Sequence, residues 1–384
     1  MKCFLKRSDF RMAVLTMVFL AMPGWTQESG KQTPQQNTDR QGLAGQRRNV
    51  SSAELFGQTA EDYSNPALAG SPALSAIVPL QLEFDQIDPN FTREIVRVQW
   101  RANDPIDLYI VAPVGVKNPP VVLYLHDYPT ENEAYMRAEF CRLLTEGGFA
   151  AVGFVPALTG QRYHDRPMKQ WFVSELRESL GTSAHDVQMV LNYLATRGDM
   201  DMNRVGMFGA GSGATIAILA AGVDSRIKAL DLVDPWGDWP DWIAKAARIP
   251  EKERPDFLKP EWVANVAPLD PVKWLPELKT QKLRIQLVKD AAVTPAEVQQ
   301  SIAVAAPANA QIVRYDSAAA FRRATSGGVG FEWVKQQLQP GAVQRYHVPG
   351  GSSAGAPTGK GGAVTLRWRT QPDGAGSRRF NANS

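Results

Sequence analysis

The chain has 384 residues, of which 44% are hydrophobic and 21% are charged, and its net charge is +3. This composition excludes a wholly disordered chain, because it supplies enough apolar side chains for one large or two medium folded domains. A net charge this small also argues against a strongly basic nucleic-acid-binding protein. The charge is unevenly placed, however. Residues 1–50 (eight basic, three acidic) and 340–384 (six basic, one acidic) each sum to +5, and residues 51–339 (28 basic, 35 acidic) sum to −7.

The N-terminus has the pattern of a secretory signal peptide. Four basic residues precede an apolar run of 11 residues, Met12 to Met22. A run of this length fits the roughly 7–15 residues of a signal-peptide core and is short of the roughly 20 needed to span a membrane. We therefore expect residues 1–26 to be a signal peptide and the protein to be secreted or periplasmic. An uncleaved membrane anchor is the weaker alternative. Cys3 would leave with the signal peptide, so Cys141 has no partner for an internal disulfide.

Two stretches lack the apolar residues that a core requires. Residues 27–72 are rich in Gln, Ser, Thr, Asn and Gly, which predicts a flexible linker. Residues 340–384 contain the run GGSSAGAPTGKGG and predict a Gly/Ser-rich basic tail, in which only 363–368 could form an edge strand. The folded domain is therefore expected over residues 73–339.

Within that domain the hydrophobic period alternates between the values typical of strands and of helices. Residues 94–101 and 106–112 alternate in polarity and predict an antiparallel pair. The runs at 121–125 and 150–155 are continuously apolar, as in strands that are buried on both faces. Between them, residues 133–146 predict an amphipathic helix that ends at two glycines.

The second half of the domain continues this alternation. Residues 183–196 predict a helix with Ser183 as its N-cap and Arg197-Gly198 at its end. The remaining predicted elements are strands at 205–208, 229–233, 283–288 and 311–315 and a last helix at 330–338. Alternating apolar strands and helices indicate an α/β fold whose mostly parallel sheet is covered on both faces.

The most informative segment is Asp201 to Leu219, DMNRVGMFGAGSGATIAIL, which predicts a strand, a sharp glycine-rich turn and a helix of small residues. It resembles the nucleophile elbow of the α/β-hydrolase superfamily, especially its esterase, dienelactone-hydrolase-like and prolyl-oligopeptidase-like branches. The resemblance covers about residues 90–338. It implies the α/β-hydrolase fold, with a mostly parallel central sheet, helices on both faces and a small cap segment. In the family's G-x-S-x-G motif, small flanking residues allow a strained turn to expose the serine, and a backbone amide faces the substrate oxyanion.

The elbow lacks a nucleophile in its natural register. Gly209 and Gly213 match the flanking glycines, so Gly211 stands at the nucleophile position and has no side chain to react. Ser212 follows, at the position that the resemblance implies for an oxyanion amide. Shifting the motif by one residue would make Ser212 the nucleophile. That register is less favoured, because it lengthens the step from strand to turn and directs the hydroxyl differently.

The other positions of a catalytic triad also depart from the family's pattern. The resemblance implies an acid near residues 289–295, KDAAVTP, where Asp290 stands; a helix-capping role is an equal alternative for it. The histidine is expected near Ala319, which has no imidazole. The chain has four histidines in all, His126, His164, His185 and His347. His347 could act only if the tail folded back over the site.

The oxyanion turn departs from the family as well. Its His-Gly turn is replaced by His126-Asp127-Tyr128, and a carboxylate at Asp127 would oppose a developing negative charge unless it points away. We therefore predict that the triad chemistry is lost and that a binding or scaffolding role remains. The alternative is an active serine hydrolase of esters or peptides that uses Ser212, Asp290 and an unplaced histidine.

A ligand pocket is the function that such a fold could retain. Trp236, Trp239 and Trp242 occur where the family's cap begins, so the first two could line a pocket for an apolar or carbohydrate ligand. Burial of these rings to anchor the cap is the alternative. The remaining candidate pocket residues are His126, Tyr128 and His164. The neighbouring Arg162 could contact an anionic ligand or lie in a solvated loop.

No cofactor or metal is expected. Residues 209–214 fit G-x-G-x-x-A, and Asp231 and Asp234 follow about 20 residues later, as in dinucleotide-binding units. That reading is disfavoured because the motif would begin in the middle of the domain. No cluster of His, Cys and carboxylates has the spacing of metal ligands. The expected partner is an unknown small molecule or polymer, not a nucleic acid, and the basic ends favour contact with anionic envelope surfaces.

Overall fold

A computed structural model describes residues 61–68, 80–101, 104–129, 132–157, 162, 172–278, 281–289, 291 and 293–339. The predicted signal peptide and C-terminal tail lie outside the described residues, as do Asp290, His164 and His347. All of the described residues belong to one compact unit within 51–384.

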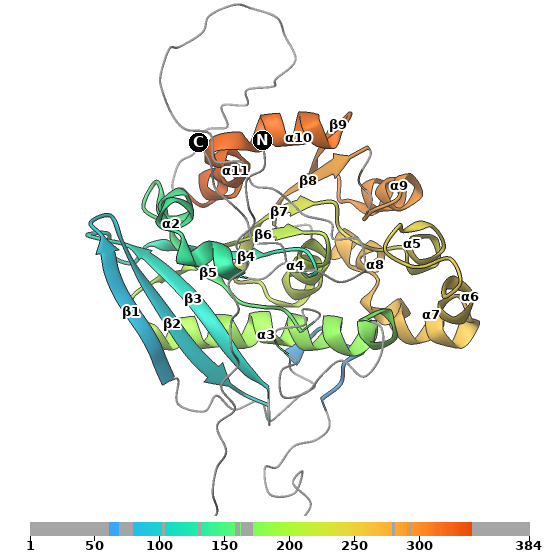
Figure 1. Ribbon diagram of the computed structural model, residues 1–384, viewed down its shortest axis with the longest axis horizontal. Coiled ribbons are helices and arrows are strands. Elements are labelled where there is room, and N and C mark those ends of the chain that lie inside the picture. Colours follow the sequence, from blue (N-terminus) through green and yellow to red (C-terminus); the bar gives the residue numbers. More distant parts are fainter. Residues whose placement is uncertain are drawn as a thin grey trace, which may run out of the picture. The chain divides into compact units, whose positions relative to one another are not determined.

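The described residues form a nine-stranded sheet in the order β1-β2-β3-β5-β4-β6-β7-β8-β9 (Figure 1). β1 to β3 are antiparallel and β3 pairs antiparallel with β5, whereas every pair from β5 to β9 is parallel. This confirms the predicted mostly parallel sheet. β1 is an edge strand that was not predicted from the sequence. The strands are β1 (Leu80–Asp88), β2 (Phe91–Gln99), β3 (Pro105–Pro113), β4 (Pro120–Leu125), β5 (Ala150–Gly153), β6 (Asp201–Ala210), β7 (Ile227–Val233), β8 (Lys282–Val288) and β9 (Gln311–Tyr315).

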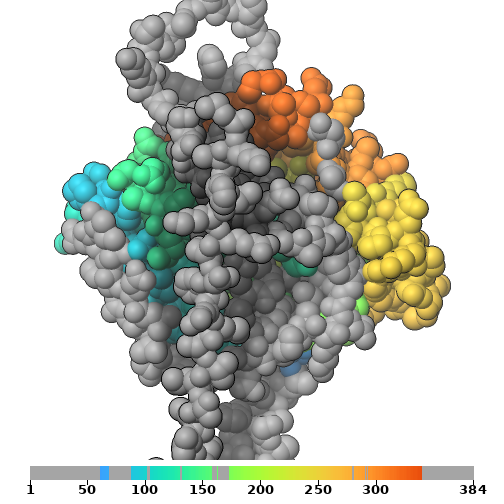
Figure 2. Space-filling view, in the orientation of Figure 1, coloured from blue at the N-terminus to red at the C-terminus, as the bar shows by residue number. Residues whose placement is uncertain are grey.

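Helices cover both faces of this sheet, as the α/β pattern predicted. α2 and α11 pack with one apolar cluster, and α3 and α4 pack with the other, on opposite sides of the strands in Figure 1. The connection between β7 and β8 contains the short helices α5 to α8, which contribute the yellow surface at the right of Figure 2. The helices are α2 (Ala138–Thr145), α3 (Leu176–Arg197), α4 (Ser212–Val223), α5 (Trp239–Lys245), α6 (Arg254–Phe257), α7 (Pro260–Val266), α8 (Pro271–Trp274), α9 (Ala296–Ala305), α10 (Ala318–Thr325) and α11 (Val329–Leu338), with 3-10 turns η2 (Asn132–Met136) and η4 (Phe172–Glu175) before α2 and α3.

The start of α3 differs from the predicted one. The helix begins at Leu176, so Ser183 lies inside it and is not its N-cap. The fully buried Ser183 hydroxyl donates to Ser179 O (2.7 Å) and accepts from the Ala157 amide (3.0 Å). A buried serine thus satisfies a loop amide from within the helix. The end of α3 is as predicted, because Gly198 adopts a φ of 72° immediately after Arg197.

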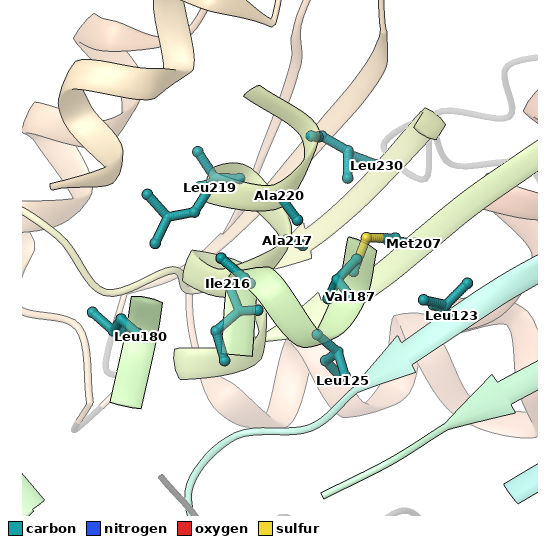
Figure 3. Packing of buried hydrophobic residues seen from close by; sticks show 14 of the residues in the cluster. Leu123, Leu125, Leu180, Val187, Met207, Ile216, Ala217, Leu219, Ala220 and Leu230 are labelled. Carbon is teal, nitrogen blue, oxygen red and sulfur yellow. The ribbon is translucent and has the colours of Figure 1, made fainter. Parts of the chain in front are cut away.

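The helix that follows the elbow packs closely on the sheet. Ala217 and Ala220 of α4 point toward Met207 of β6 and Leu230 of β7 in Figure 3, and all four residues are fully buried. Small side chains on this face bring the α4 axis near the strands, which fixes where its N-terminus emerges. The elbow is therefore held on a rigid base.

Residues 61–68 also belong to the folded unit, although the sequence placed them in a linker. The Gln188 side-chain amide on α3 donates to Pro66 O (2.7 Å), and its oxygen accepts from the Leu68 amide (3.0 Å). The segment therefore docks on α3. Among the described helices, none combines the length and the apolar composition of a membrane-spanning segment.

Candidate functional site

A single residue, Gly211, joins the end of β6 to the start of α4. Its φ of 52° and ψ of −118° lie in a region that glycine adopts readily and other residues seldom do. A sharp strand-to-helix turn of this kind is the feature that lifts a nucleophile above the sheet in the G-x-S-x-G motif. The turn is centred on Gly211, and Ser212 is already the first residue of α4.

The space that an elbow side chain would enter is filled by Asp127, which follows β4. A Cβ added at Gly211 would lie 2.0 Å from Asp127 Oδ1 and 2.2 Å from its Cγ. Such distances are far inside van der Waals contact. The carboxylate therefore points into the elbow and takes up the volume of the missing side chain.

Asp127 also bonds to the Ser212 amide, which the resemblance predicts as an oxyanion donor, and to Arg248. Its Oδ1 accepts the Ser212 amide N–H (2.9 Å), and its Oδ2 accepts Arg248 Nη2 (2.5 Å). Only 13% of the Asp127 side chain and 16% of the Arg248 side chain are exposed. Burial raises the pKa of Asp127, and this effect is opposed by Arg248 and by the Ser212 amide. The site thus already contains a carboxylate, that of Asp127, paired with a cation, the guanidinium of Arg248.

Arg248 lies in the cap segment beyond α5 and is a site residue that no sequence pattern predicted. Its Nη1 donates to Tyr128 O, and its guanidinium carbon lies 5.8 Å from the centroid of the Tyr128 ring and 5.5 Å from that of Trp236. Both rings lie within cation–π range. A partly buried carboxylate such as Asp127 favours a cationic side chain next to it. No local pattern near residue 248 indicates which one, because the partners are 121 residues apart.

The Ser212 hydroxyl is buried and occupied as an acceptor. It is 1% exposed, and its Oγ accepts the Tyr128 amide N–H (2.9 Å). Neither of the two histidines that the structure describes makes a hydrogen bond to it. His185 contacts Glu61 (2.5 Å) and Asn65 O (2.8 Å) instead.

His126 lies next to the site but within the packed interior. It is 8% exposed, its ring centroid is 6.3 Å from that of Phe140, and burial lowers its pKa to about 4. After the last strand, Ala319 lies in the first turn of α10, whose N-cap Ser317 accepts the Ala320 amide (3.1 Å). The segment where the family places its histidine is thus an ordinary capped helix.

Burial corrects the expectation that Trp236 and Trp239 line a pocket. Both are fully buried, as is Trp242. The Trp236 and Trp242 rings stack with centroids 4.7 Å apart. The indole N–H of Trp239 donates to Val266 O (3.1 Å), and that of Trp242 donates to Val293 O (3.0 Å). The rings attach the cap to the domain, and Trp236 supports Arg248.

Two further groups of candidate residues form hydrogen bonds and ion pairs within the chain. Arg162 is neither solvated nor open to a ligand, because it pairs with both oxygens of Asp104 (2.8 and 2.6 Å) and with Asp186 (2.5 Å). Asp231 is buried against Arg284, and the Asp234 carboxylate accepts the Val288 amide. The described residues contain no group of three His, Cys, Asp or Glu side chains placed to hold a metal ion.

Comparisons with known proteins agree with this architecture. A family model described as the dienelactone hydrolase family matches residues 106–233, from β3 to the end of β7. The solved structure of acetyl xylan esterase 1 from Thermoanaerobacterium sp. is similar at 13% identity and a TM-score of 0.53, covering 62% of this chain and 81% of that one. The acetyl xylan esterase from Paenibacillus sp. is similar at 16% identity and a TM-score of 0.52, covering 67% and 88%. No curated protein matches the chain. Strand order, elbow geometry and these matches together show that the chain has the α/β-hydrolase fold.

Proposed function

We propose that this protein no longer performs Ser-His-Asp hydrolysis and that its α/β-hydrolase fold serves a binding or scaffolding role. The observation that supports this most directly is the Asp127 carboxylate, which lies in the volume of an elbow side chain and bonds to the Ser212 amide.

Acyl transfer requires a nucleophile, a base within hydrogen-bond reach and free donors for the oxyanion. Gly211 supplies no nucleophile, and the Ser212 amide N–H already has an anionic acceptor. A second negative charge developing beside Asp127 would be repelled by the carboxylate at low effective dielectric. Each of these features opposes catalysis by a different physical route.

A binding role needs only a recognition surface. The Asp127–Arg248 pair lies beyond the carboxyl ends of the parallel strands β4 and β6, which is where open α/β sheets hold their ligands. Arg248 is partly exposed there and lies within cation–π range of two aromatic rings. A small molecule or polymer that contacts this edge is the proposed partner.

A fluorophosphonate probe tests the loss of hydrolysis. The full chain and its Ser212→Ala variant should remain equally unlabelled, with equal background rates on p-nitrophenyl acetate, while circular dichroism shows both to be folded. Stoichiometric labelling of the unaltered chain that disappears in the variant would establish the alternative, an active serine hydrolase using Ser212.

We also propose that the chain is exported through residues 1–26 and that its basic ends contact anionic envelope surfaces. The support for export is the basic N-terminus followed by an apolar run. The support for the surface contact is the charge that remains after cleavage, +2 on residues 27–50 (four basic, two acidic) and +5 on residues 340–384. Intact-mass measurement of the protein recovered outside the cytoplasm should show loss of the signal peptide; a full-length mass would refute cleavage. Cosedimentation should be stronger with anionic than with neutral vesicles, and equal binding would refute the surface contact.

A further inference from the structure

Helix α3 turns one face toward residues 61–68, which we call the strap. The contacting positions on α3 are Gly181, His185 and Gln188, which we call the α3 groove. Their spacing of four and three residues places them on a single face of the helix.

The strap approaches α3 so closely that only glycine is compatible with it at position 181. A Cβ added at Gly181 would lie 2.4 Å from Tyr63 O and 2.8 Å from Tyr63 Cα. These are backbone atoms, so no side-chain rotation can relieve the overlap. A larger residue at position 181 would displace the strap itself.

The other two groove residues bind the strap mainly through its main chain. His185 Nε2 lies 2.8 Å from Asn65 O, and Gln188 bonds to both Pro66 O and the Leu68 amide. Contacts of this type recognise the path of a backbone whatever its side chains, as main-chain hydrogen bonds do in other modes of peptide recognition.

One side chain of the strap adds specificity. The two carboxylate oxygens of Glu61 each accept from Arg101 (2.6 Å), and Oε1 lies 2.5 Å from His185 Nδ1. The Glu61 side chain is only 8% exposed. A buried bidentate pair of this kind favours a glutamate strongly over a neutral or basic residue.

The strap is also shaped by its own short-range bonds. The Asp62 carboxylate accepts the Ser64 amide, and the Asn65 side chain accepts the Ala67 amide, both at 2.9 Å. Such Asx turns are local, so they persist in a peptide of this sequence more readily than long-range contacts do. Pre-organisation lowers the entropy lost when such a segment binds.

We propose that the α3 groove is a peptide-docking surface and that residues 61–68 occupy it as a replaceable ligand in cis. The recognised feature is a turn-containing segment led by a glutamate. Main-chain bonds to His185 and Gln188 supply affinity, and the Glu61–Arg101 pair supplies selectivity.

Fluorescence anisotropy with a labelled synthetic peptide of residues 60–69 tests this on the full chain. In Glu61→Arg, the chain's own strap is repelled by Arg101 and the groove becomes open. The peptide should bind this variant at least about tenfold more tightly than it binds the unaltered chain, whose tethered strap competes at high effective concentration. Equal binding to the two chains, or no binding to a folded Glu61→Arg chain, would overturn the proposal.

The matched control is Glu61→Arg combined with Gly181→Ala, in which the added methyl group blocks the groove. Binding of the peptide should be lost there, and undiminished binding would place the peptide elsewhere. If circular dichroism shows that Glu61→Arg does not fold, Glu61→Gln replaces it, because it removes the negative charge without adding a positive one. The same two outcomes are required: tighter peptide binding than in the unaltered chain, and loss of that binding when Gly181→Ala is added.

Discussion

A side chain at position 211 would have to share its volume with Asp127, since an ideal Cβ there lies 2.0 Å from Oδ1. The glycine and the carboxylate are therefore coupled, although they are distant in sequence. The glycine spacing of the elbow was enough to predict the register at Gly211. The partner of Asp127 could not be predicted, because Arg248 reaches the site only through the packing of the cap on Tyr128 and Trp236.

This coupling predicts how substitutions at the two positions combine. Gly211→Ala should destabilise the chain by about 1–3 kcal/mol, because the methyl group overlaps the carboxylate. In an Asp127→Ala background the same change should cost at least about 1 kcal/mol less, since the overlapping atoms are gone. Urea unfolding of the four chains gives the coupling energy. Strictly additive free energies would show that the two side chains do not compete for one space.

Most element boundaries followed from local sequence patterns, and the exceptions have tertiary causes. β9 occupies the predicted residues 311–315, and α3 ends at its predicted glycine. The start of α3 was misplaced because Ser183 has the composition of an N-cap but satisfies the Ala157 amide, which only the fold brings near. The tryptophans of the cap were ambiguous for a similar reason, because aromatic spacing does not distinguish a pocket from a core.

Their burial predicts an effect on stability. Trp239→Phe should lower the free energy of unfolding by about 1–3 kcal/mol, because it removes a fully buried indole edge and leaves Val266 O without its donor. Thermal and urea unfolding measure the change. Trp262→Phe is the control, because Trp262 is only partly buried and packs on Phe257, so its loss should be smaller. An equal loss at both positions would contradict the structural role assigned to Trp239.

At the scale of the whole molecule, one buried ionic network connects segments that lie far apart in sequence. Asp186 of α3 is fully buried and accepts from Trp100, Arg101 and Arg162. Arg101 also donates to Glu61 of the strap, and Arg162 also donates to Asp104. The network thus joins α3 to the strap, to the loop between β2 and β3, and to the segment after β5. None of these pairings has a local sequence signature, so the sequence indicated charged residues but not their partners.

The network predicts a defined acid response. Burial alone would raise the pKa of Asp186, but Arg101 and Arg162 outweigh it and lower the pKa to about 2, below the ordinary value of 3.8. A carboxyl with a depressed folded pKa contributes stability above its unfolded pKa and loses it as the pH falls through the folded value. Asp186→Asn should therefore destabilise the chain by about 3–5 kcal/mol at pH 7, because it leaves two buried guanidinium groups without their shared anion.

The difference between the unaltered chain and Asp186→Asn should shrink as the pH falls from about 4 toward 2, where about half of the native carboxyl is protonated. Urea unfolding across this range measures it. Asp107→Asn is the matched control, because its pair with Arg97 is exposed and should contribute less than about 1 kcal/mol at any pH. A cost for Asp186→Asn that equals the control at pH 7, or that persists unchanged at pH 2, would mean that Asp186 is not the ionised centre of the network.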